Sequence, residues 1–104
     1  MKELLDELER GLTDLLQMGL ATAGADMVRR LRELSDRAEG AGLHTGGAVF
    51  SKIATLLEER AHTMVKTDLD TAAAVFRAQH YITLCRARLT EKDIRARWQE
   101  GGIT

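Results

Sequence analysis

Proline is absent from this 104-residue chain, and aromatic residues make up only 4% of it. Because proline breaks helices and aromatic side chains favour strands, these two shortages favour helices over β-sandwiches and barrels. The one cysteine, Cys85, excludes an internal disulfide, so the fold must depend on packing and we expect a reducing compartment, the cytoplasm. No apolar run approaches the roughly 20 residues of a membrane helix, and the acidic N-terminal stretch is unlike a signal peptide.

A net charge of −1 excludes a global field that would select a polyanionic partner. The charges are unevenly distributed, because residues 1–39 hold six basic and nine acidic groups whereas residues 71–104 hold six and three. This asymmetry permits head-to-tail contacts or contacts with a partner.

Leucines recur at three- and four-residue steps over residues 2–18, which is the period of one helix face. Gly19 follows, and glycine is the residue that most readily ends a helix with a positive φ. A similar apolar spacing over residues 23–41 predicts a second helix. Its other face is charged, as expected for a helix that is exposed on one side.

Several glycines and a histidine lie between residues 40 and 47, directly before the third apolar stripe. A phosphate-binding loop would need a lysine after its last glycine, or a strand before it, and the sequence offers neither. We therefore interpret the stretch as a joint in which Gly42 ends one helix and Thr45 caps the next. The third helix is expected to end near Val65 or Lys66.

Apolar residues of the fourth helix, which is expected to begin near Asp70, cover more than one face. We therefore predict that it is the most buried helix and lies centrally. Thr90 and Asp93 resemble a weak capping box, so residues 91–100 form either a further short helix or a continuation of the fourth.

The predicted fold is an all-α, antiparallel bundle of four main helices with a short C-terminal helical extension. A single domain is expected over residues 1–100, with a frayed tail over residues 101–104.

Histidine and cysteine positions do not match a known metal or catalytic pattern. Glu59 and His62 have the spacing used in di-iron bundles, but the second copy that such a site needs is missing. His80 and Cys85 are five residues apart and diverge on a helix, and His44 is expected in an exposed turn. We predict that the protein is not an enzyme and has no metal or cofactor. A metal or small-molecule site inside the bundle is the third and weakest hypothesis.

Two apolar surfaces are candidates for binding a protein partner or a second copy of the chain. Their residues are Leu4, Leu8 and Leu15 on the first helix, and Ile94 and Trp98 near the C-terminus.

A basic run near the C-terminus offers an alternative function, the binding of nucleic acid. Its cations would follow a phosphate backbone while the Trp98 indole stacks on a base. Acidic residues in the same segment weaken its field, so we place this alternative second. The candidate residues are Arg86, Arg88, Lys92, Arg95 and Arg97.

The helix joints and leucine stripes together resemble a known bacterial module. The similarity lies in Leu15-Leu16-x-Met18-Gly19-Leu20, Leu31-Arg32-Glu33-Leu34 with Arg37-Ala38, Ala41-Gly42-Leu43, and Ala54-x-Leu56-Leu57-Glu58-x-Arg60. In this order they resemble the helical region that accompanies the SWIM-type zinc finger in bacterial proteins of unknown function, over residues 4–89. The chain lacks the finger's Cys-x-Cys followed by Cys-x-His, so zinc binding is not implied. The resemblance implies a helical accessory module of a multi-component bacterial system. We therefore expect a non-enzymatic protein-interaction or scaffold module.

Overall fold

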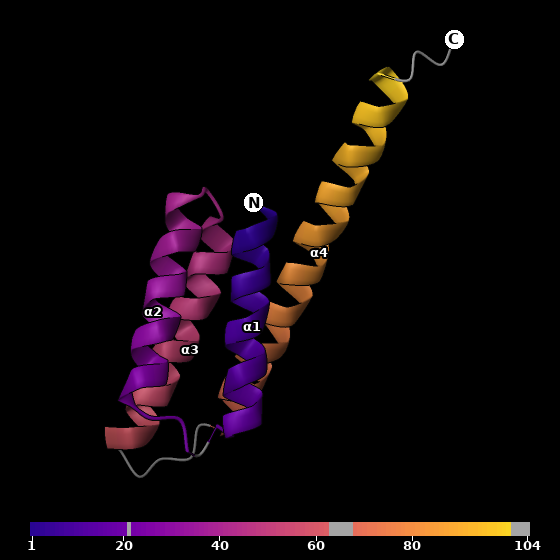
Figure 1. Ribbon diagram of the computed structural model, residues 1–104. Coiled ribbons are helices and arrows are strands. Elements are labelled where there is room, and N and C mark those ends of the chain that lie inside the picture. Colours follow the sequence, from indigo (N-terminus) through magenta and orange to yellow (C-terminus); the bar gives the residue numbers. More distant parts are fainter. Residues whose placement is uncertain (21, 63–67, 101–104) are drawn as a thin grey trace.

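The computed structural model describes residues 1–20, 22–62 and 68–100, and these residues form four helices and no strand. The helices are α1 (Lys2–Met18), α2 (Ala25–Gly40), α3 (His44–His62) and α4 (Asp68–Glu100). They run alternately up and down, and each contacts the two beside it, with α4 closing the ring against α1 (Figure 1). The predicted all-α bundle of four main helices is confirmed.

The core lies along the centre of this ring and is almost entirely aliphatic. The leucine stripe of α1 points inward and belongs to the same buried cluster as Phe50 and Ile53 of α3, which are both fully buried. Burying one such side chain contributes roughly 1.5–3 kcal/mol, so the core supplies the main driving force for folding. The aliphatic residues that are inaccessible or nearly so include Leu5, Leu8, Leu12 and Leu15 of that stripe, and Leu31, Ala38, Ala54, Val75 and Ala78 of the other helices.

The joint between α2 and α3 has the geometry of a glycine-terminated helix. Gly42 has a φ of +87°, and its N–H donates to the Glu39 carbonyl over 3.0 Å while the Leu43 N–H donates to the Ala38 carbonyl over 2.8 Å. These two bonds satisfy carbonyls at the end of α2 and define a Schellman motif. The interpretation of this stretch as a helix joint is confirmed.

Helix α1 begins where it was predicted, and the starts of the other three helices differ from the predicted ones by two residues. The prediction that Thr45 caps α3 is wrong, because the Gly47 N–H already reaches the Leu43 carbonyl over 2.9 Å and the helix begins at His44. The predicted end of α3 at Val65 or Lys66, and the predicted tail at 101–104, lie outside the described residues.

Helix α4 is continuous from Asp68 to Glu100, so the predicted extension is part of the same helix. Its 33 residues span about 50 Å at 1.5 Å per residue, whereas α1–α3 have 16 to 19 residues each. Figure 1 shows α4 leaving the bundle, and the molecule measures 64 × 23 × 20 Å. From Thr90 onward, every α4 side chain that the structure describes is exposed. We call residues 90–100 the overhang.

The prediction that α4 is the most buried helix and lies centrally is wrong. A ring of four helices has no central member, and α4 places one face against α1 and α3. The side chains buried on that face are small or medium in size: Thr71, Ala74, Val75, Ala78 and Ile82. The remaining apolar residues of α4 lie elsewhere on its surface. The described helices also include none that is long and apolar enough to cross a membrane.

Candidate protein-interaction surface

Helix α4 carries a second line of apolar side chains on the face that points away from the bundle. Because each residue turns a helix by about 100°, these positions fall within a sector roughly opposite the buried face. We call this line the outer stripe. Its large members, with their exposed fractions, are Leu69 (88%), Phe76 (69%), Leu84 (50%), Ile94 (49%) and Trp98 (61%).

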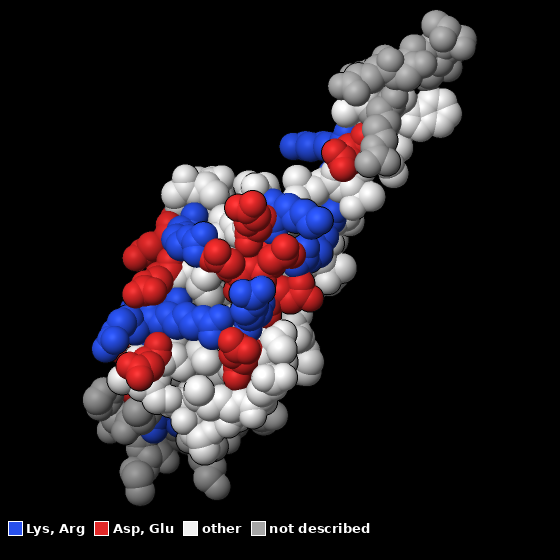
Figure 2. Space-filling view, in the orientation of Figure 1, with Lys and Arg blue, Asp and Glu red and all other residues white. Residues whose placement is uncertain are grey.

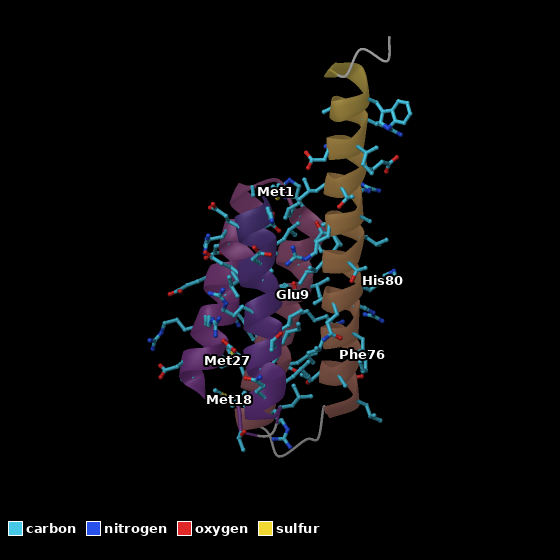
Figure 3. All side chains as sticks on the ribbon, turned by 45° about the vertical axis from the view of Figure 1, so that its right-hand side comes forward. Met1, Glu9, Met18, Met27, Phe76 and His80 are labelled. Atoms are coloured by element: carbon cyan, nitrogen blue, oxygen red, sulfur yellow. The ribbon has the colours of Figure 1, made fainter. Side chains whose placement is uncertain are left out.

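Smaller residues complete the outer stripe between the large ones. Ala73, His80 and Ala87 occupy the same sector, as does the charged Glu91, and all four are exposed. Figure 3 shows Phe76 and His80 projecting from α4 on the side away from the other helices. The stripe therefore has the three- and four-residue spacing of a surface that packs against another helix.

The outer stripe continues where the buried face of α4 ends. Beyond Leu89, the positions that would face the bundle are occupied by Asp93 and Ala96, which are exposed. Ile94 and Trp98 instead extend the line begun by Leu69 and Phe76. The apolar side of the overhang is therefore continuous with the uncovered face of α4 and not with the core.

Three of the five residues predicted for partner binding are unsuited to it. Leu8 and Leu15 are fully buried and Leu4 is 9% exposed, because α1 turns its leucine stripe into the core. Their assignment to a docking surface is wrong for the folded chain. Ile94 and Trp98 are exposed, as a docking surface requires.

Sequence reasoning missed the other large members of the outer stripe. Because it predicted the fourth helix to be the most buried, it did not single out Leu69, Phe76 or Leu84 as exposed. The signal that could have found them is the seven-residue spacing that relates Leu69 to Phe76, and Ala87 to Ile94.

The basic run of α4 does not form a single cationic surface. Arg86 turns back to α1, where its guanidinium donates to the carboxylates of Asp6, over 2.7 Å, and Glu9, and these two acids raise its pKa. Arg95 pairs with Glu91 over 2.8 Å on the exposed overhang. Both cations are thus partly neutralised within the chain.

The remaining basic candidates lie apart from Arg86. Arg88 and Lys92 line a groove on another side of α4, and the side chain of Arg97 lies outside the described part of the chain. Figure 2 shows acidic and basic side chains interleaved over the face formed by α1 and α2, where Arg30 pairs with Asp14 and Arg37 with Glu7. This face presents no extended area of one sign.

A groove beside Arg88 has a volume of about 600 Å³. It lies between the α2–α3 joint and α4, and Tyr81 and Cys85 form part of its wall. The two side chains are hydrogen bonded; burial raises the pKa of the Tyr81 hydroxyl, and the bond with Cys85 raises it further. His44 also lines the groove, but its Nδ1 lies 2.6 Å from Glu39.

Within the described residues, no hydrogen bond joins Cys85 to His44, and no three metal-ligating side chains gather. His80 lies on the outer stripe, and the side chain of His62 is outside the described part. The groove thus brings together a tyrosine, a thiol and an imidazole that is paired with Glu39.

Comparisons with known proteins identify no relatives. No family model matches the chain, and neither a curated protein nor a solved structure resembles it significantly. The similarity to the helical region of SWIM-type zinc-finger proteins, the bacterial origin and the absence of enzyme activity remain predictions.

Proposed function

We propose that the protein is a non-enzymatic interaction module that binds a helical protein partner through the outer stripe of α4. The observation that carries the proposal is the length of the stripe, which runs from Leu69 to Trp98 and continues past the end of the bundle. A stripe that served only folding would end with the bundle, as the buried face of α4 does.

The exposed apolar area supports the same function. With about 200 Å² for each fully exposed large side chain, the exposed fractions of the five large members amount to roughly 600 Å². A typical monomer exposes its largest apolar patch over about 300–600 Å², and larger patches mark binding sites. The outer stripe is at the upper end of that range.

The nucleic-acid alternative has less support. Arg86 and Arg95 already pair with acids, and Arg88 and Lys92 lie on a different side of α4 from Arg86. A phosphate backbone would therefore meet two neighbouring cations and not a row of five. Binding of DNA that weakens steeply with added salt would support this alternative against the proposal.

The test of the proposed function compares the wild-type chain with Phe76→Glu. Each protein is immobilised and exposed to a lysate of the source cells, and the bound proteins, the chain itself included, are identified by mass spectrometry. A protein that binds the wild type and not the variant supports the proposal. Gln79→Glu is the matched control, because Gln79 is exposed on α4 outside the outer stripe. Identical binding by all three chains contradicts the proposal.

A further inference from the structure

The overhang and the first turns of α4 both carry exposed apolar side chains that a second helix could cover. Leu69 and Phe76, on the outer stripe beside the bundle, are exposed and uncovered. Ile94 and Trp98 are apolar side chains on the overhang, where every described side chain is exposed. Isolated helices shorter than about 12–15 residues are marginal in water, so the overhang gains most from a neighbouring helix.

We infer that the partner is a second copy of this chain, whose α4 lies antiparallel along the outer stripe of the first. The inference rests on the proposed function and names the partner for the same surface. In this arrangement the overhang of each copy covers the first turns of α4 in the other. The contact is isologous, so it closes as a dimer.

Apolar residues match in this arrangement when the two-fold axis lies midway between Thr83 and Ala87. Phe76 of each copy then faces Ile94 of the other, and Trp98 faces the segment that contains Leu69 and Ala73. Near the axis the facing side chains are smaller, including Thr83 and Ala87, so the two helices can approach closely.

Charged residues in and beside the outer stripe match in the same register. Arg77 of one copy lies level with residue 93 of the other, two residues from Glu91, so the two long side chains can meet. Opposite charges at such flanking positions set the orientation of paired helices. A parallel pairing would instead place Arg77 opposite Ala72 and Gln79, which carry no charge.

The area also agrees with a dimer. Two stripes of roughly 600 Å² each would bury about 1,200 Å² from both copies, which is the lower limit for specific interfaces. The stems of Arg77 and Arg95 and the intervening alanines add to this value. The interface is therefore large enough for a dimer of moderate affinity.

The first test uses disulfide trapping in a Cys85→Ser background, which removes the one native thiol. Chains with Phe76→Cys and chains with Ile94→Cys are oxidised separately and as a mixture. The antiparallel dimer predicts a mixed disulfide between the two variants in excess of either homodimer. A Thr55→Cys chain is the control, because Thr55 is exposed on α3, away from the stripe.

The second test is sedimentation equilibrium, in which the wild-type protein is expected at twice the 11.5 kDa mass of one chain. Phe76→Glu should raise the dissociation constant at least about 30-fold, the size expected for loss of an aromatic anchor. Arg77→Glu should also weaken the dimer, and the double variant Arg77→Glu/Glu91→Arg should restore it. Circular dichroism confirms that each variant is folded.

The outcomes separate this inference from the proposed function. A monomeric wild type that still binds another protein through Phe76 overturns the inference and leaves the proposed function standing. A monomer that binds no protein through Phe76 overturns both. A dimer whose Phe76→Cys chains join only to each other overturns the antiparallel arrangement.

Discussion

The Ser35 hydroxyl of α2 donates a hydrogen bond to the Gly47 carbonyl of α3 over 2.6 Å, and Ser35 is only 6% exposed. This bond joins the two helices near their shared joint, at a place where water cannot replace it.

Ser35→Ala is expected to lower the free energy of unfolding by about 1 kcal/mol, because it removes a buried hydrogen bond without creating a large cavity. Urea unfolding followed by circular dichroism measures the change. Thr55→Ala, which removes a hydroxyl from an exposed position of α3, should leave the free energy of unfolding within about 0.5 kcal/mol of wild type. Equal effects from both variants would show that the Ser35 bond contributes nothing.

Gly46 and Gly40 offer a second matched comparison. A methyl group on Gly46 would lie 2.7 Å from Cε1 of Tyr81, whereas one on Gly40 would have no neighbour within 4 Å. Gly46→Ala should therefore lower the free energy of unfolding by roughly 1–3 kcal/mol through overpacking. Gly40→Ala should raise it, by up to about 1 kcal/mol, because alanine is the better helix former. Thermal unfolding of both variants is the measurement, and opposite signs are the expected result.

The two glycines near the start of α3 also show where sequence reasoning reached its limit. Gly46 and Gly47 were interpreted as part of the joint because glycine clusters usually mark turns. In the structure both lie in the first turns of α3, and a Cβ on Gly47 would lie 2.6 Å from Glu39. Glycine suits both positions because side chains of other helices approach closely there, and such approaches depend on tertiary structure.

The fourth helix explains why the candidate surface was only partly predicted. A helix with one apolar stripe, such as α1, must bury that stripe, so its position in the bundle follows from sequence. Helix α4 has two stripes, and periodicity alone cannot tell which one the bundle covers. Ile94 and Trp98 were found because they lie four residues apart and form a small apolar patch, whereas Phe76 lies in a segment whose apolar residues cover more than one face.

The only two phenylalanines test this difference directly, because Phe50 is fully buried and Phe76 is 69% exposed. Phe50→Ala should lower the free energy of unfolding by about 3–5 kcal/mol at every protein concentration. Phe76→Ala should lower it only where the dimer is populated, and the difference from wild type should vanish on dilution. Urea unfolding at several protein concentrations measures both. A large, concentration-independent cost for Phe76→Ala would show that its side chain supports the monomer.

Tyr81 gives a prediction for the pH dependence of stability. Burial and the bond with Cys85 raise its pKa above the ordinary value of 10.0. The hydroxyl is neutral when protonated, so its contribution to stability is complete below about pH 10, where the unfolded chain also keeps the proton. As pH rises from there through the folded pKa, the unfolded chain loses its proton first and the free energy of unfolding falls.

The free energy of unfolding, measured with urea in alkaline buffers, should therefore fall more steeply with pH for a chain that keeps Tyr81 than for a chain with Tyr81→Phe. Both chains carry Cys85→Ser, so that the thiol does not titrate in the same range. Tyr81 is the single tyrosine, and its ultraviolet absorbance should report a lower pKa once the chain is unfolded in urea. The same tyrosine pKa in folded and unfolded protein would contradict the prediction.

The overhang can be removed to separate folding from association. A chain that ends after Thr90 keeps every buried residue of α4, the last of which is Ile82, so the bundle should fold with a free energy of unfolding unchanged within about 0.5 kcal/mol at high dilution. It should lose self-association, because each overhang supplies the cover for Leu69 and Phe76 of the other copy. A chain that ends after Gln79 is the control and should not fold, because it lacks Ile82. If the longer truncated chain still dimerised as tightly as the wild type, residues 90–100 would be no part of the interface, since the loss of Ile94 and Trp98 would then cost no contact.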